Sequence, residues 1–99
     1  MDVSKVMKKV EKLIGLEGLE DSGEYMQLGI DESITNEEIV RTLEEQDVEF
    51  VDSLVFIGEE DTMYGVILEL DSEDDIIEIV EIDPEGEGTE VLYTSDKFK

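Results

Sequence analysis

From residue 48 onwards the apolar residues follow the two-residue period of β-strands, and this feature constrains the fold more than any other. Four segments rich in β-branched and aromatic residues are Val48–Ile57, Thr62–Leu70, Asp75–Asp83 and Thr89–Ser95. The connections between them are Gly58–Asp61, Asp71–Asp74 and Pro84–Gly88. Connections this short join antiparallel neighbours. The segments therefore predict a four-stranded antiparallel meander.

The N-terminal half predicts two helices. Residues 3–14 place apolar side chains at helical spacing with lysines on the other faces, and Gly15 occupies the position of a C-terminal cap. Thr35 followed by Glu38 is a capping-box pattern, which opens a second helix that runs to about Gln46. Both helices are amphipathic, so we expect their apolar faces to pack against the sheet.

The segment between the helices is less regular. Residues 16–24 are expected to form a loop from which Leu16 and Leu19 fold back onto the core, and Tyr25–Leu28 predicts a short extra strand. Residues 1–99 are thus expected to form a single α+β domain, with two helices packed on one face of a four-stranded, or five-stranded, antiparallel β-meander. The apolar stripe of the first helix belongs either to this core or to the seam of a homodimer.

The charge of the chain is extreme and unevenly placed. Thirty acidic residues against 7 basic ones give a formal net charge of −23. All the acidic residues except Asp2 and Glu11 lie between Glu17 and Asp96, where Arg41 is the only base. Such density costs stability through self-repulsion. Adaptation to salt fits poorly, because the bases are nearly all Lys and Ala is absent. A merely solubilising surface usually needs a much smaller net charge.

The residue inventory disfavours catalysis. The chain has no His and no Cys, so the usual general base, the strongest nucleophile and any disulfide are missing. A pair of carboxylates that cleaves a glycosidic bond needs a substrate cleft, for which a domain this small has little room. We therefore expect no enzyme and no cofactor. The N-terminus has no signal-peptide pattern and no segment is long enough to span a membrane, so a cytoplasmic protein without membrane contact is expected.

Two acidic stretches resemble calcium loops only in part. Asp83–Gly88 has a glycine at the sixth position, but Thr94 stands where the twelfth position requires Glu. Asp71–Asp75 is followed by Ile76, where that glycine is required. Both stretches are therefore interpreted as hairpin turns, with no specific metal site. Direct binding to nucleic acid is also not expected, since the acidic body repels a phosphate backbone.

Alternating carboxylates along the strands provide the specific functional hypothesis. Alternate residues of a strand point to one face about 6.6 Å apart, close to the step of roughly 7 Å between phosphates along one DNA strand. Two such series are Glu69, Asp71, Glu73, and Glu81, Asp83, Glu85, Glu87. The candidate partner-binding surface comprises Glu44, Glu45, Asp47, Glu49, Glu59, Glu60, Asp61, Glu69, Asp71, Glu73, Asp74, Asp75, Glu78, Glu81, Asp83, Glu85, Glu87 and Glu90.

In size, in its lack of His and Cys, in its Lys- and Ile-rich background and in its acidic α+β character, the chain resembles the DNA-mimic proteins that bacteriophages make during host takeover. It is most similar in kind to acidic phage proteins that occupy the DNA-binding surface of the bacterial histone-like protein HU. The resemblance covers the whole chain and rests on composition and charge layout. It implies a stoichiometric inhibitor that blocks a basic DNA-binding protein in competition with DNA, inside the bacterial host cytoplasm.

Two other functions are left open by the sequence. An immunity protein or antitoxin that plugs a cationic nuclease would also be acidic, and would use a few aromatic anchors, for which Tyr25, Tyr64 and Tyr93 are the candidates. An acidic housekeeping protein with no charge-directed partner is the other. The strand-rich half also resembles small acidic proteins of unknown function from low-GC Gram-positive bacteria.

Overall fold

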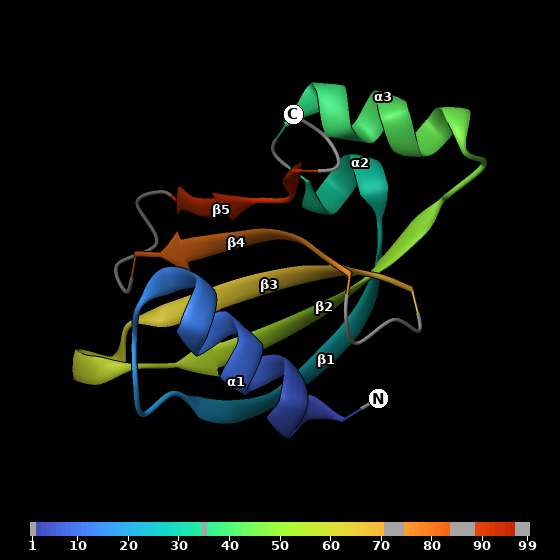
Figure 1. The fold of residues 1–99 in the computed structure, drawn as a ribbon. Helices are drawn as coiled ribbons and strands as arrows, with labels where there is room; N and C mark the ends of the chain where they lie inside the picture. Colours follow the sequence, from blue (N-terminus) through green and yellow to red (C-terminus); the bar gives the residue numbers. More distant parts are fainter. Residues whose placement is uncertain (1, 35, 71–74, 84–88, 97–99) are drawn as a thin grey trace.

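The computed structural model describes residues 2–34, 36–70, 75–83 and 89–96. Within these ranges five strands form one antiparallel sheet, in which the spatial order follows the chain order from β1 to β5 (Figure 1). The helices are α1 (Val3–Ile14), α2 (Ile30–Ser33) and α3 (Glu37–Glu45), and η1 (Glu59–Asp61) is a 3-10 turn. The strands are β1 (Glu20–Gly29), β2 (Phe50–Ile57), β3 (Met63–Glu69), β4 (Ile76–Ile82) and β5 (Thr89–Thr94).

The predicted α+β class and the antiparallel meander are confirmed. Each of β2 to β5 lies within one of the four segments that the two-residue period indicates. The fifth strand is also present, but β1 is 10 residues long and takes in residues 20–24 of the stretch 16–24 that was expected to be a loop. Most of its side chains are exposed, so it lacks the alternation of apolar and polar residues that marks a half-buried strand.

A local irregularity explains why β1 is hard to find in the sequence. Its pairing with β2 shifts between Asp21 and Tyr25, where Gly23 has a φ of 81°. In this bulge the Ser22 hydroxyl donates to the Val55 carbonyl oxygen at 2.6 Å, and the Gly23 N–H donates to Asp21 Oδ1 at 2.9 Å. Side chains thus replace part of the missing backbone ladder, and the glycine supplies a conformation that other residues rarely adopt.

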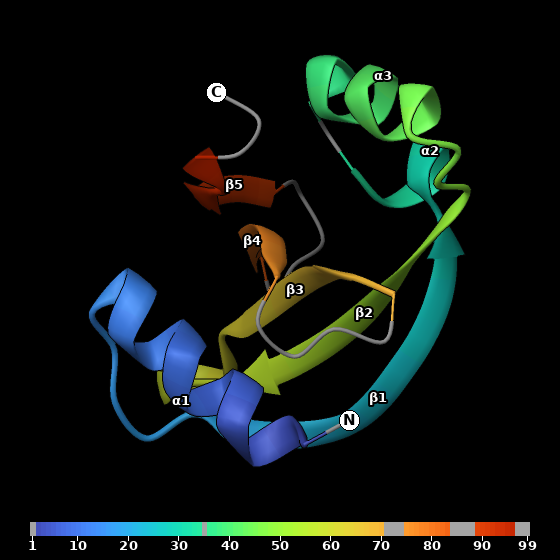
Figure 2. The ribbon, with the colours of Figure 1, turned by 45° about the vertical axis from the view of Figure 1, so that its right-hand side comes forward.

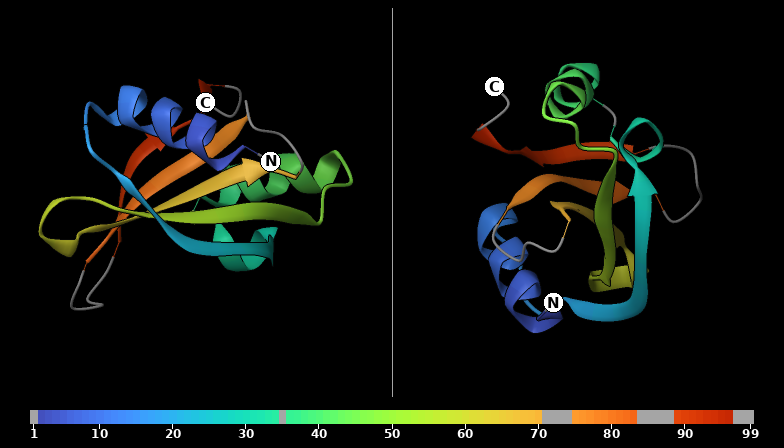
Figure 3. Two further views of the ribbon diagram at one scale, coloured as in Figure 1. Left: turned by 90° about the horizontal axis from the view of Figure 1, so that it is seen from below. Right: turned by 90° about the vertical axis from the view of Figure 1, so that its right-hand side faces the viewer.

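The helices cover opposite faces of the sheet, which corrects the expectation that both pack on one face. Val6 and Val10 of α1 lie in one core cluster with side chains of β2, β3 and β4, among them Phe56 and Val66. The second cluster joins the α2–α3 segment to the other face, where Val51, Ile67 and Ile77 lie. Because strand side chains alternate between faces, Val66 and Ile67 point in opposite directions. Figures 2 and 3 show α1 and α3 on the two sides of the curved sheet.

The two-sided cover follows from the composition of the central strands. β3 is buried from Tyr64 to Leu68, and β4 begins with two consecutive buried isoleucines. A strand buried on both faces reads as a continuous apolar run, and each face then needs its own cover. The stripe of α1 belongs to the core, since Val6 and Val10 are fully buried.

Three of the four predicted ends of the two helices agree with the structure to within one residue. α1 has the predicted bounds and ends at Gly15, whose φ of 71° is the left-handed conformation of a C-terminal cap. α3 ends one residue before the predicted Gln46. Its N-cap, however, is Asn36, whose side chain accepts from the Glu38 N–H at 2.9 Å. The predicted capping residue Thr35 lies outside the described residues. Among those residues no helix is both long and apolar enough to cross a membrane.

Candidate functional site

The described carboxylates of the predicted surface divide into two groups at opposite ends of the sheet. The first, called the α3–β2 acidic group, comprises Glu44, Glu45, Asp47, Glu49, Glu69 and Asp75. The second, called the η1–β4 acidic group, comprises Glu59, Glu60, Asp61, Glu81, Asp83 and Glu90. The eight residues of β2 separate them by about 23 Å, at ~3.3 Å per residue. The predicted residues Asp71, Glu73, Asp74, Glu85 and Glu87 lie outside the described residues.

One residue of the predicted partner-binding surface, Glu78, is not accessible to a partner. Glu78 is 1 % exposed, so it cannot present its charge to a partner. It stands opposite Ile67 in the register, next to the irregularity where β3 and β4 shift by one residue. That position turns its side chain towards the face that α3 covers. The strict alternation assumed from the sequence would not reveal such a bulge.

The η1–β4 acidic group brings together carboxylates from separate parts of the chain. Glu81 and Glu90 stand directly opposite each other on β4 and β5. Like charges in this cross-strand position destabilise a sheet. Glu60 and Asp61 both have positive φ, 56° and 61°, a backbone conformation that is costly for residues other than glycine. Folding alone therefore does not favour these acidic residues at these positions.

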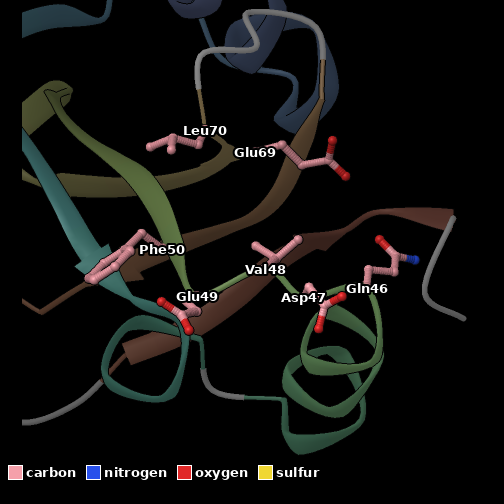
Figure 4. Close-up of a pocket in the computed structure, with 7 residues that line it drawn as sticks. All are labelled: Gln46, Asp47, Val48, Glu49, Phe50, Glu69 and Leu70. Atoms are coloured by element: carbon pink, nitrogen blue, oxygen red, sulfur yellow. The ribbon is translucent and has the colours of Figure 1, made fainter.

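Three members of the α3–β2 acidic group, Asp47, Glu49 and Glu69, line an open hollow of about 410 Å³. The lining of this Phe50 hollow is drawn in Figure 4: Gln46, Asp47, Val48, Glu49, Phe50, Glu69 and Leu70. Phe50 is 52 % exposed and Leu70 is 42 % exposed. In Figure 4 both side chains extend to one side of the strands, whereas the Glu69 carboxylate points to the other. The hollow thus combines two exposed apolar side chains with a carboxylate rim.

A backbone turn places this rim. Asp47 has a φ of 61°, and its N–H donates to the Glu44 carbonyl oxygen at 3.0 Å. The Val48 N–H donates to the Leu43 carbonyl oxygen at 2.9 Å. These bonds end α3 and direct the chain into β2, and Asp tolerates the left-handed conformation better than most residues. The Asp47 and Glu49 side chains are consequently exposed on either side of half-buried Val48.

Two of the three tyrosines proposed as anchors lie in or against the core, and the third is exposed but bonded to a buried carboxylate. Tyr64 is 8 % exposed, and Tyr93 packs against the α1 core cluster. Tyr25 is 46 % exposed, but its hydroxyl donates to Asp52 Oδ1 at 2.7 Å. Asp52 is fully buried, and sequence reasoning did not select it. Phe50 is a more accessible aromatic anchor than Tyr64 or Tyr93, and sequence reasoning missed it because its strand position resembles that of buried Phe56.

Within the described ranges, no three Asp or Glu side chains are close enough to hold a metal ion together. Comparison of the chain with protein-family models, with curated proteins and with solved structures finds no match in any of the three.

Proposed function

We propose that the chain is a non-enzymatic acidic protein that binds a basic DNA-binding protein, of the HU-like nucleoid kind, in competition with DNA. The observation that carries this proposal is the display of exposed carboxylates at both ends of one well-packed sheet, in a chain of net charge −23. A basic surface that meets these carboxylates exchanges counterions as it does on DNA, and the complementary potentials steer the two proteins together.

The arrangement of the α3–β2 acidic group supports the proposal further. Glu44, Glu45, Asp47 and Glu49 are all exposed within six residues of the sequence, at a helix end held by backbone hydrogen bonds. Carboxylates on a fixed scaffold lose less conformational entropy on binding than carboxylates on a disordered tail. A lysine- or arginine-rich surface would therefore find a preorganised anionic partner.

The test is competition for a complex of HU with a labelled DNA duplex, followed by fluorescence anisotropy at stepped salt concentrations. The test variant replaces Glu44, Glu45 and Glu49 by Gln and Asp47 by Asn. The control variant replaces Glu20, Glu24 and Glu32 by Gln and Asp31 by Asn; these four are also exposed. Both variants lose the same charge, but we expect the test variant to compete at least about tenfold less well.

Two outcomes would count against the proposal. If the wild-type chain leaves the HU–DNA complex intact at low salt, HU is not its partner. If both variants lose competition equally, the binding is diffuse attraction to a polyanion and not recognition of a site.

The Phe50 hollow favours one second candidate, an inhibitor that plugs a cationic nuclease. Tight inhibitors of this class depend on a few central, desolvated anchors surrounded by a polar rim, and Phe50 and Leu70 have that arrangement. Binding of such a partner would survive high salt and would depend on Phe50. Binding of a DNA-competing partner would instead weaken steeply as salt rises.

A further inference from the structure

A second hollow, of about 560 Å³, lies between the α1–β1 loop and the β2–β3 turn. We call it the Tyr64 hollow; its lining includes Glu17, Leu19, Gly58, Glu59, Glu60 and Tyr64. The three glutamates are exposed and come from two segments that are distant in the sequence. Tyr64 belongs to a third segment, β3, and only 8 % of it is exposed.

The Tyr64 hydroxyl is the polar group that distinguishes this hollow from other acidic surface. Among the described residues the structure records no hydrogen bond for it. Every fully enclosed side-chain nitrogen or oxygen in the described part of the chain has a partner. The unpartnered hydroxyl is therefore not enclosed, and Tyr64 is one of the residues that line the hollow. A mostly buried phenol whose oxygen is neither enclosed nor paired, in the lining of an acidic hollow, is an unused hydrogen-bond acceptor and donor.

The position of this phenol is fixed by its neighbours. A Cβ atom at Gly58 would lie 2.8 Å from Tyr64 Cε2, so the ring is held against the backbone of the turn. The turn itself is closed by the Gly58 N–H, which donates to the Thr62 carbonyl oxygen at 2.8 Å. Little rearrangement would therefore be needed for a ligand to use the hydroxyl and the carboxylates together.

The local potential favours a cation. Burial first, and then the carboxylates of Glu81 and Glu59, raise the pKa of the Tyr64 phenol above its ordinary value. The two carboxylates are thus near enough to act on the phenol although neither accepts a hydrogen bond from it. A group that carries positive charge and several N–H donors would match the carboxylates and the phenol among the residues that line this hollow.

We propose that the Tyr64 hollow is a binding site for the guanidinium group of an arginine side chain. A guanidinium has five N–H donors in a rigid fork, so it can reach the phenol oxygen and carboxylates on different segments at once. It is also more weakly hydrated than an ammonium group, which favours a partly buried position beside an aromatic ring. The site as such stands on this geometry; its use by an arginine of a DNA-binding partner rests on the proposed function.

The first experiment titrates the chain with N-acetyl-arginine amide at about 0.1 M salt and follows the Gly58 and Thr62 amide signals and the Tyr64 ring signals by NMR. At this salt the Debye length is about 10 Å, shorter than the ~23 Å of β2. Glu59→Gln should weaken binding about tenfold and Tyr64→Phe about threefold. Glu49→Gln removes the same charge from the other end of the sheet, and should change the affinity less than about twofold.

Three results would overturn the site. The first is equal weakening by Glu59→Gln and Glu49→Gln, which indicates diffuse attraction. The second is equal affinity for N-acetyl-lysine amide, or displacement of the probe by an equal concentration of Mg²⁺, because the site would then bind cations in general. The third is the absence of saturation below about 20 mM probe. Glu59→Gln, Tyr64→Phe and Glu49→Gln change side chains only, and each variant is checked for folding by circular dichroism.

A second experiment separates the free amino acid from a protein source. A basic peptide with one arginine among lysines is compared with the same peptide in which that arginine is lysine. Preference for the arginine peptide, lost in Glu59→Gln, supports a partner's side chain as the ligand. If the variants differ in their affinity for the small probe but not for the peptides, the site binds a guanidinium group, and the proposal that it binds an arginine of a partner protein is wrong. Failure of the HU competition would leave both peptide results unaffected, so the two proposals can fail separately.

Discussion

The two ends of the sheet present their acidic residues in different ways. At the α3–β2 end four of the six carboxylates lie within residues 44–49, and Asp47, Glu49 and Glu69 line the hollow beside Phe50, whose ring is half exposed. At the η1–β4 end the carboxylates come from distant segments and surround Tyr64, whose ring is almost fully buried. The first end offers apolar contact within a charged rim, and the second offers polar acceptors around a hollow of about 560 Å³. The same acidic chain thus offers an apolar contact at one end of the sheet and a polar contact at the other.

This difference predicts different responses to salt. Screening weakens attraction between exposed charges, whereas burial of apolar surface is not weakened by salt. Binding at the η1–β4 end should therefore fade as salt rises, and part of the binding at the α3–β2 end should persist.

The largest expected effect follows from the way α3 is attached. Leu43 is fully buried in the cluster that joins α3 to the sheet. Leu43→Ala should lower the free energy of unfolding by about 3 kcal/mol, through lost burial and the cavity that remains. Urea unfolding measures this loss. Leu13→Ala, at a position on α1 that is 40 % exposed, is the control and should cost less than about 1 kcal/mol.

Hydrogen exchange in the same variant tests whether the clusters on the two faces of the sheet are independent. We expect faster exchange of the α3 amides and unchanged exchange of the α1 amides, since the helices belong to separate clusters on opposite faces. Equal acceleration in both helices would show that the two clusters unfold as one unit.

The next effect concerns the turn at the η1–β4 end. Gly58→Ala places a methyl group against the Tyr64 ring and 3.3 Å from Leu19 Cδ2, and should cost about 2 kcal/mol. Gly23→Ala is a useful comparison, because open space surrounds that position and only its φ of 81° opposes a side chain. Its cost should be about 1 kcal/mol. If urea unfolding gave Gly58→Ala the smaller loss, the ring would not be held against the turn.

The sequence predicts the sheet better than it predicts either end. The period of two and the short turns indicated β2 to β5, because hydrophobic alternation and local connections specify antiparallel neighbours. The same pattern did not show that Glu78 is buried or that Phe50 is exposed. Both depend on register and on the helix that covers each face, which are long-range properties.

The acidic groups show the same limit. The cluster from Glu44 to Glu49 was predicted because its members are neighbours in the chain. The approach of Glu17 to Glu59 around Tyr64 arises from the packing of the α1–β1 loop beside the β2–β3 turn, and no local pattern encodes it. The asparagine that caps α3 was missed for a smaller reason, since Thr35 and Asn36 are adjacent and both are good capping residues.

A moderate effect on binding should identify the apolar part of the interface. Phe50→Ser should weaken binding of the basic partner about tenfold at high salt, because an exposed aromatic anchor is lost. Stability should hardly change, as the ring is 52 % exposed. Met26→Ser on β1, where the side chain is 56 % exposed, is the matched control. Anisotropy titrations at two salt concentrations measure both, and equal losses would remove the Phe50 hollow from the interface.

The smallest expected effect probes the potential at the η1–β4 end. The raised pKa of the Tyr64 phenol means that the folded chain disfavours the phenolate, first through burial and then through Glu81 and Glu59. Stability from this group is fully present below the ordinary pKa of about 10 and is lost as the pH rises through the higher pKa of the folded state. Glu81→Gln should lower that pKa, which should still stay above its ordinary value because burial remains.

Absorbance at 295 nm during an alkaline titration measures this shift. The chain has three tyrosines and no tryptophan, and the Tyr64→Phe variant identifies the Tyr64 step by its loss. Glu49→Gln, at the other end of the sheet, should leave the step in place. Addition of N-acetyl-arginine amide should lower the pKa of Tyr64 in the wild-type chain, since a bound cation offsets the two carboxylates. An unchanged pKa at saturating probe would place the guanidinium outside the Tyr64 hollow. The η1–β4 end would then have a differently shaped hollow from the α3–β2 end, but no arginine site of its own.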